Sequence, residues 1–190
     1  MIRVKITYDN IISIIRDDLC PRIFDRLNQL HLDSIDALVI PKSALNFAND
    51  LFYELGPKVG NIELLPCNIR GDLSNIAFED VCLGSKSVLI VDSILDTGFT
   101  MMTVVNNLKE RVENIITCSL LKKLRKDKVC YYDNPEHIYG FLISDYFAVG
   151  YGLDYNQKFR NIKNIFDYKE VDRYIKISGL DSFYEFSSNL

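Results

Sequence analysis

SVLIVDSILDTGFT, residues 87–100, joins a short apolar run to a polar turn. The four consecutive apolar residues from Val88 to Val91 are flanked by polar ones, which is the pattern of a β-strand buried on both faces. A helix is expected to follow from about Thr100 to Val112. This segment therefore predicts a buried strand, a tight loop and a helix, which is the repeating unit of an α/β fold.

Strands and helices alternate on both sides of this segment. The expected elements are an amphipathic helix at 9–30, strands at 35–40, 62–69, 115–121, 139–143 and 147–152, and a helix at 45–55. Pro21 is a candidate interruption of the first helix, and Gly56 ends the second. The alternation implies a mainly parallel sheet with helices on both faces, and ligands bind such sheets at the carboxyl ends of the strands. The tail after about Arg160 shows no periodicity that guides an interpretation.

Length and composition bound the class of protein. The chain has 190 residues, of which 48% are hydrophobic and 25% charged, the balance of a folded protein with a large core. No linker or repeat divides the sequence, so we expect one domain. The net charge of -4 is mixed along the chain and gives no broad positive field for nucleic acid or an anionic membrane.

Three features predict a cytoplasmic protein. Five cysteines without a CxxC pair favour a reducing compartment. The first residues, MIRVKITYDNIISII, break their apolar stretches with Asp9 and Asn10 and do not have the pattern of a signal peptide. No apolar run approaches the ~18 residues that a membrane span needs.

The turn at residues 92–100 carries the informative chemistry. Two carboxylates (Asp92 and Asp96), one glycine (Gly98) and two hydroxyls (Thr97 and Thr100) precede or open a helix whose N-terminus favours anions. Carboxylates beside a phosphate would repel it unless they meet sugar hydroxyls, a metal or a transferable proton. The combination points to a phosphorylated sugar. The competing interpretation is an ordinary helix N-cap made by Asp96 or Thr100.

Two motifs resemble one enzyme family. VLIVDSILDTGFT (88–100) is similar to the signature of type I phosphoribosyltransferases, which bind phosphoribosyl pyrophosphate (PRPP), although Ser93 stands where the family has a second adjacent acid. ISDYFAVGYGLDYNQKFRNI (143–162) resembles the purine-binding region of hypoxanthine-guanine phosphoribosyltransferases. Weaker matches are LVIPKSALNFANDL (38–51), in place of the pyrophosphate loop, and SLLKK (119–123), in place of the base-recognition segment.

The resemblance, which covers roughly residues 10–165, implies a fold and an activity. The implied fold is the α/β type I phosphoribosyltransferase fold, a mainly parallel central sheet flanked by helices with a small hood subdomain, in a single domain over 1–190 whose tail, 166–190, has an uncertain role. The implied activity is purine salvage, in which Mg²⁺-dependent transfer of the phosphoribosyl group to hypoxanthine or guanine releases pyrophosphate and a nucleoside monophosphate. A homodimer or homotetramer is implied as well.

The resemblance also assigns residues to the PRPP site. Asp96 is implied as the proton acceptor at the purine imidazole nitrogen, a kind of assistance that contributes ~10²–10⁴-fold. The residues implied to bind PRPP are Asp92 and Ser93 at the ribose, Asp96, Thr97, Gly98, Phe99 and Thr100 around the 5′-phosphate, and Lys42, Ser43 and Arg160 at the pyrophosphate. Asp154 and Asp92 are the implied ligands of Mg²⁺, which takes few carboxylates together with phosphate oxygens.

The purine site is implied by four residues. Lys123 is expected to donate to the oxygen at C6, which favours an oxopurine over an aminopurine, although Lys122 is an adjacent competitor. Phe147 is expected to stack on the base, with backbone groups of Ala148 at the base edge, and Asp154 is implied as the fourth purine-binding residue. The non-functional alternatives are a solvated surface lysine for Lys123, a core position for Phe147 and a surface ion pair for Asp154.

Other functions stay open beside this one. Ser93, the Lys-Ser-Ala loop and a lid near residues 70–77 that looks short are compatible with a PRPP- or nucleotide-binding regulator of weak or no catalysis. Xanthine or a modified purine is an alternative base. The chain has no GxxxxGK[ST] or GxGxxG motif, which argues against P-loop kinases and dinucleotide-binding dehydrogenases. His31 and His137 suggest no catalytic zinc site and are expected at the surface or partly buried.

Overall fold

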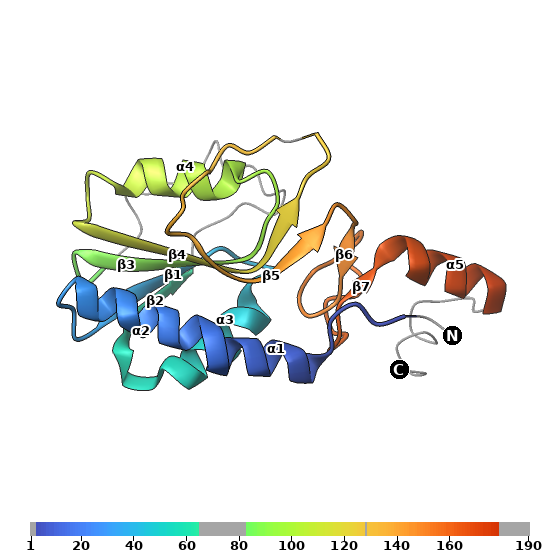
Figure 1. Cartoon of the computed structure of the whole chain (residues 1–190), viewed down its shortest axis with the longest axis horizontal. Helices are drawn as coiled ribbons and strands as arrows, with labels where there is room; N and C mark the ends of the chain where they lie inside the picture. Colours follow the sequence, from blue (N-terminus) through green and yellow to red (C-terminus); the bar gives the residue numbers. More distant parts are fainter. Residues whose placement is uncertain (1–2, 65–82, 128, 179–190) are drawn as a thin grey trace.

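The computed structural model describes residues 3–64, 83–127 and 129–178, and its centre is a five-stranded parallel sheet (Figure 1). The strands lie in the order β2-β1-β3-β4-β5. Their bounds are Ile35–Val39 (β1), Val59–Leu64 (β2), Ser87–Leu95 (β3), Asn114–Leu124 (β4) and Ile138–Ser144 (β5). The predicted parallel α/β fold is confirmed, and the expected lid at 70–77 and the end of the strand expected at 62–69 lie outside the described residues.

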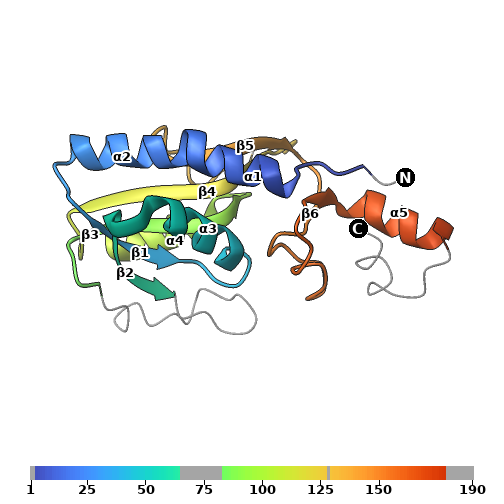
Figure 2. The same ribbon diagram turned by 90° about the horizontal axis from the view of Figure 1, so that it is seen from below.

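β3 is buried on both faces, as its sequence predicts. Val88 and Ile90 pack with α4 (Phe99–Leu108) on one face, whereas Leu89 and Val91 pack with the helices of the other face. This alternation follows from the period of two along a strand. Figure 1 shows α1 (Tyr8–Ile14), α2 (Cys20–Gln29) and α3 (Leu45–Leu55) on the side of the sheet opposite α4, and Figure 2 views the molecule from the side of these three helices.

Pro21 does not break the first helix. The segment runs as α1 (Tyr8–Ile14), a π-helical turn (Ile15–Leu19) and α2 (Cys20–Gln29), with helical backbone angles at each junction. The N–H of Cys20 donates to the carbonyl of Ile15, five residues earlier. The wider π turn directly before Pro21 lets the helix continue past a residue that has no N–H to donate.

A smaller unit lies beyond the carboxyl ends of the central strands (Figure 1). We call residues 146–178 the hood. It contains β6 (Ala148–Val149), β7 (Phe166–Asp167) and α5 (Tyr168–Ser178), and β6 pairs with β7 in antiparallel fashion. Its own apolar core consists of Val149, Phe159, Ile162, Phe166 and Val171. The tail that the sequence left uninterpreted therefore supplies β7 and α5, at least to Ser178.

Among the described residues, none of the helices combines the length and the apolar character that a membrane crossing requires.

His137 is buried, which corrects the expectation of a surface or partly buried histidine. Only 2% of it is exposed, and its ring nitrogens lie 2.9 Å from the hydroxyls of Ser119 and Thr117 on β4. Burial, followed by the nearby charges of Lys122 and Arg22, lowers its pKa to about 4. The imidazole therefore stays neutral in the folded protein and fastens the connection between β4 and β5 to the sheet.

The histidine predicts how stability depends on pH. Its pKa is lower in the folded protein than the 6.5 expected after unfolding, so its contribution is complete above pH 6.5 and is lost as the pH falls toward 4. Between pH 7 and pH 5 we expect this group to lower the free energy of unfolding by about 2 kcal/mol. Urea denaturation of wild type and His137→Asn at both pH values measures it. An equal pH dependence in the two proteins would contradict the assignment.

Candidate functional site

The candidate site lies at the carboxyl ends of four parallel strands, where predicted site residues and others meet. The loop 41–44 follows β1, the turn 96–98 follows β3, Arg125 follows β4, and Asp145 follows β5. Because these strands are parallel, their carboxyl ends share one edge of the sheet. The site therefore lies where the order of elements in the sequence predicted it.

Two serines join the loop after β1 to the end of β3. The hydroxyl of Ser93, which is 2% exposed, donates to the hydroxyl oxygen of Ser43 at 2.8 Å. Asp92 accepts a hydrogen bond from the Ser93 N–H at 2.7 Å, and burial raises its pKa to about 6. The peptide bond between Pro41 and Lys42 is cis. The residue that replaces the expected second acid is thus used to tie the two loops together.

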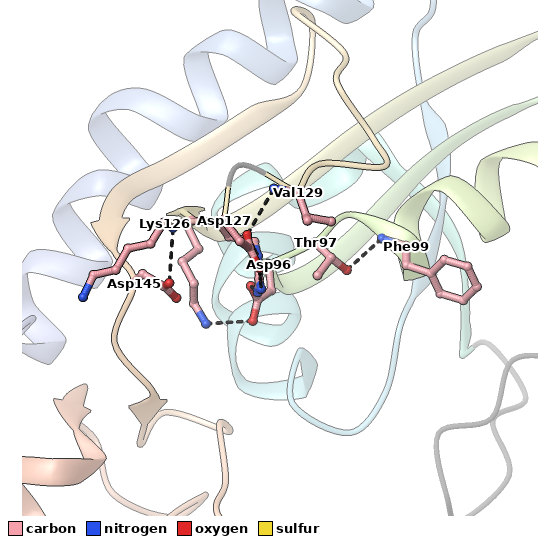
Figure 3. Close-up of polar contacts among 9 residues, drawn as sticks. Asp96, Thr97, Phe99, Lys126, Asp127, Val129 and Asp145 are labelled. Atoms are coloured by element: carbon pink, nitrogen blue, oxygen red, sulfur yellow. Dashed lines mark hydrogen bonds and ion pairs between the residues drawn. The ribbon is translucent and has the colours of Figure 1, made fainter.

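The turn before α4 is covered by the connection between β4 and β5. Gly98 has φ of +77°, and a Cβ atom there would lie 2.7 Å from the Cβ of Tyr132. The N–H of Tyr131 donates to the carbonyl of Thr97 at 2.7 Å. The hydroxyl of Thr97 accepts from the N–H of Phe99 at 3.3 Å (Figure 3). Glycine is required here both by the left-handed backbone and by the close approach of a second chain segment.

The helix-capping interpretation of this turn is wrong. The N-cap of α4 is Gly98, which has no side chain to donate or accept, and no side-chain hydrogen bond caps this helix. Thr100 lies in the first turn of the helix, and Phe99 is half exposed rather than packed in the core. The Thr97 hydroxyl accepts from the first amide of the helix, that of Phe99, and the N-cap residue places no side chain over the amides that follow. Those amides suit an anion.

Asp96 is held by two cations. Its Oδ2 lies 2.7 Å from the Nζ of Lys123, and its Oδ1 lies 2.6 Å from an Nη of Arg125. Partial burial raises the pKa of the carboxyl, but the hydrogen bonds and charges of Lys123 and Arg125 outweigh it, and the net pKa is lowered. Asp96 is therefore ionised and fixed in orientation. Lys123, which was expected at the base, also contacts the expected proton acceptor.

A pocket of about 570 Å³ lies beside this ion pair. Lys123 and Phe147 both line it, so the structure brings together two of the residues expected at the purine. The remaining lining residues are Lys126, Ser144, Asp145, Tyr146, Asp167 and Lys169. The Phe147 ring is about half exposed and meets the rings of Tyr155 and Tyr168 edge-on. Ala148 is buried in β6, and neither Ala148 nor Asp154 lines this pocket.

Asp154 and Arg160 lie together in the hood. Arg160 forms an ion pair with Asp154 at 2.7 Å and donates to the carbonyl of Gly152 at 2.7 Å. The other oxygen of Asp154 accepts from the N–H of Gln157 at 2.8 Å. Gly152 itself packs on the loop after β1, because a Cβ atom there would lie 2.3 Å from the carbonyl oxygen of Ser43. The hood thus places the Asp154–Arg160 pair beside the Ser43 loop.

The described residues contain no cluster of three His, Cys, Asp or Glu side chains that would hold a metal by themselves. This donor set fits a magnesium ion that arrives with a phosphate ligand, because Mg²⁺ keeps waters and takes one or two carboxylates plus phosphate oxygens. The carboxylates implied for that role are Asp92, near the end of β3, and Asp154, in the hood.

Arg125 and Asp127 are site residues that sequence reasoning missed. Arg125 contacts Asp96, and Asp127 accepts two hydrogen bonds from the Arg125 guanidinium. A signal was present in the sequence, since Arg125 follows Lys123 by two positions and residues two apart in an extended chain point to the same side.

Comparisons with known proteins agree on one family. Residues 83–156 match the model of the phosphoribosyl transferase domain. The chain is 41% identical over 103 residues to the hypoxanthine-guanine phosphoribosyltransferase of Canis lupus familiaris, an alignment of 52% of this chain and 46% of that protein, and 39% identical over the same length to that of Homo sapiens. The alignment thus spans about half the length of these curated relatives.

Solved structures extend the likeness to most of the chain. A hypoxanthine-guanine-xanthine phosphoribosyltransferase superposes with a TM-score of 0.71 and 26% identity, over 87% of this chain and 95% of the other. A hypoxanthine phosphoribosyltransferase from Staphylococcus aureus superposes with a TM-score of 0.69 and 26% identity, over 87% and 90% of the two chains.

The contact between the hood and the Ser43 loop predicts the effect of one substitution. Gly152→Ala forces both a strained backbone, at φ of +95°, and an overlap with the Ser43 carbonyl. We expect it to lower the free energy of unfolding by about 3 kcal/mol. Gly56→Ala is the matched control, because Gly56 also has a positive φ but nothing within 4 Å of its Cβ position, and it should cost about 1 kcal/mol. Urea denaturation measures both, and equal losses would refute the close packing.

Proposed function

Because this chain carries a phosphoribosyl transferase domain and has the type I phosphoribosyltransferase fold, we propose that it transfers the 5-phosphoribosyl group of PRPP to a 6-oxopurine, hypoxanthine or guanine. The products are pyrophosphate and the nucleoside monophosphate. One observation carries the proposal: Lys123 both contacts Asp96 and lines a pocket with Phe147. The proton acceptor, the oxygen-binding cation and the stacking ring therefore belong to one site.

The base half of the reaction follows from these three side chains. In the proposed complex, the purine ring stacks on Phe147, which is about half exposed and lines the pocket. Lys123 donates to the C6 oxygen and, because an ammonium cannot accept a hydrogen bond, it disfavours a 6-amino group. Asp96, ionised and oriented, accepts the hydrogen of the imidazole nitrogen as positive charge develops there.

The PRPP half uses the loops after β1 and β3 and the hood. The 5′-phosphate occupies the turn 97–100 at the N-terminus of α4, where backbone amides and the hydroxyls of Thr97 and Thr100 donate to it. Asp92 and Ser93 lie at the ribose hydroxyls. On the pyrophosphate side are Lys42, Ser43 and Arg160. Bond breaking at C1 builds positive charge on the ribose and negative charge on pyrophosphate, so fixed positions and charges of this kind lower the barrier.

Magnesium is proposed as the cofactor, held by Asp92 and Asp154. When bound with PRPP, it neutralises charge on the leaving pyrophosphate. The ion pair of Asp154 with Arg160 supports this placement, because the hood holds both groups beside the Ser43 loop. The negative charge of Asp154 suits a metal ion, and the positive charge of Arg160 suits pyrophosphate. The cytoplasmic location and the homodimeric or homotetrameric state stay predictions.

A regulator that binds PRPP without efficient transfer is the second candidate. The observation that favours it is the engagement of the site side chains with one another: Asp96 is paired with Lys123 and Arg125, and Ser93 with Ser43. Catalysis requires some of these contacts to be exchanged for contacts with substrate.

The deciding experiment measures pyrophosphate release from PRPP and Mg²⁺ with hypoxanthine, guanine, xanthine and adenine in parallel, together with calorimetric binding of PRPP alone. Turnover with hypoxanthine or guanine supports the proposal, and a preference for xanthine would replace the base. Binding without turnover supports the regulator. A protein that neither binds nor turns over PRPP would contradict both candidates.

Asp96→Asn tests the proton acceptor. The amide keeps the size of the side chain but loses the negative charge, so we expect kcat to fall about 100-fold or more while the KM for PRPP changes less than about threefold. Asp25→Asn, at an exposed position of α2, is the matched control and should leave both constants unchanged. Equal losses in kcat and in PRPP affinity would instead assign Asp96 a structural role.

A further inference from the structure

Asp96 receives its two cations from the end of one strand. Lys123 is the penultimate residue of β4, and Arg125 follows the strand directly. The two residues are two positions apart and reach the two oxygens of the same carboxylate, at 2.7 and 2.6 Å. The carboxylate is thus held by one cation at each oxygen.

The ammonium group of Lys123 has a second proposed partner, the purine base, besides Asp96. It lines the pocket that also contains Phe147, and only 8% of its side chain is exposed. In the function proposed above, this ammonium donates to the C6 oxygen of the base. Lysine carries a single compact charge on a flexible stem, so a contact with the base weakens its contact with Asp96.

Arg125 has no proposed contact with the base. It is not among the residues that line the pocket, and its guanidinium is fixed from the other side by Asp127. The Nε of Arg125 donates to one oxygen of Asp127 at 2.9 Å, and an Nη donates to the other oxygen. The N–H of Val129 donates to the same carboxylate at 3.1 Å. A planar guanidinium held at two points by one acid presents its remaining N–H to Asp96 in a fixed direction.

We propose that Arg125 is a positioning residue that keeps Asp96 ionised and aimed at the purine while Lys123 turns to the base. The proposal rests on the proposed function. The two cations have different roles. Lys123 exchanges its contact with Asp96 for a contact with the substrate, whereas Arg125, which is anchored by Asp127, keeps its contact with Asp96. The resemblance that first indicated the site assigned no role to either Arg125 or Asp127.

The charges around Asp96 make the proposal measurable. The groups that face it are Lys123 and Arg125, with Asp127 behind Arg125. Without Arg125, Asp96 depends on Lys123 alone, and it loses that partner whenever the base takes the ammonium. Its pKa must then rise, because the desolvation of the partly buried carboxyl is no longer opposed.

The first test compares the pH dependence of kcat in wild type, Arg125→Gln and Arg125→Lys. For Arg125→Gln we expect the acid limb, where activity falls on protonation of Asp96, to move up by about one pH unit. We also expect kcat at pH 7.5 to fall about tenfold or more, with the KM for the base changed less than about threefold. Arg125→Lys keeps the positive charge but loses the planar guanidinium that contacts Asp96 and Asp127 at once. Its acid limb should therefore return toward that of wild type, while kcat recovers only in part.

Lys86→Gln is the matched control, because it also removes one cation of an ion pair, with Glu113, at an exposed position outside the site. It should leave the profile unchanged. If the wild-type protein is active and the acid limb of Arg125→Gln lies at the same pH as that of wild type, the proposal is overturned. Loss of activity without that movement would mean that Arg125 only supports the loop.

The second test needs no activity. Carbon-13 NMR of the labelled Asp96 carboxyl, assigned with Asp96→Asn, gives its pKa directly in wild type and in Arg125→Gln. A rise of about one unit in the variant supports the proposal, and an unchanged value overturns it. If the variant shows this rise but the wild-type protein transfers no phosphoribosyl group, the proposed function is refuted, and Arg125 remains the residue that sets the charge of Asp96.

Discussion

The parallel pairing of β3 with β4 places Asp96 opposite Lys123. Ile94 lies beside Leu121 and Leu95 beside Lys122, so the next step in this register brings the carboxylate and the ammonium together. A slip of one residue would turn Lys123 to the opposite face of the sheet. The register is fixed by burial, because Leu89 and Val91 must face one helical layer while Val88 and Ile90 face the other. The apolar strand thus determines the electrostatics at its end.

The second half of the site depends on how closely the hood approaches the loop after β1. Gly152 has no side chain, and its backbone therefore touches the carbonyl of Ser43. Two residues away from this contact, Asp154 meets Arg160, and the buried hydroxyl of Tyr151 donates to Asp50 of α3 at 2.6 Å. These contacts hold charged groups of the hood beside a loop that belongs to the central sheet. Charges fixed in advance cost no reorganisation during a reaction that moves charge.

Polar and charged side chains of the candidate site pair with one another. Asp96 has Lys123 and Arg125, Asp154 has Arg160, and Ser93 has Ser43. A partly buried carboxylate without a partner is costly, so such pairing stabilises the arrangement. A substrate that carries both phosphates and hydrogen-bonding edges can replace these partners group by group. Arg125 is the exception in our proposal, because Asp127 holds its guanidinium on Asp96 while substrate binds.

Local patterns were sufficient for the elements and for the turn. The apolar run 88–91 predicted β3, Gly56 marked the end of α3, and the spacing of acids, glycine and threonines in 92–100 indicated an anion site before a helix. The helix boundaries were less accurate: residues 9–30 contain a π turn, because the strain of Pro21 is relieved by hydrogen bonding that spacing does not reveal. The strand expected at 147–152 is reduced to the two residues of β6, and β7 was not predicted. The two strands pair with each other, and a partner distant in the sequence is not encoded by a local pattern.

The sequence by itself determined the class of fold, the order of its strands and helices, and the residue types at the site, because periodicity, turn chemistry and motif spacing are local properties of the chain. Only the tertiary structure decided which of these residues meet. Lys123 lies on Asp96 as well as in the pocket, Ser93 bonds to Ser43, and Arg125 joins Asp96 to Asp127. Partners of this kind come from register and packing between distant segments, and the free energy of an ion pair depends on burial and on neighbouring charges that a linear sequence does not contain.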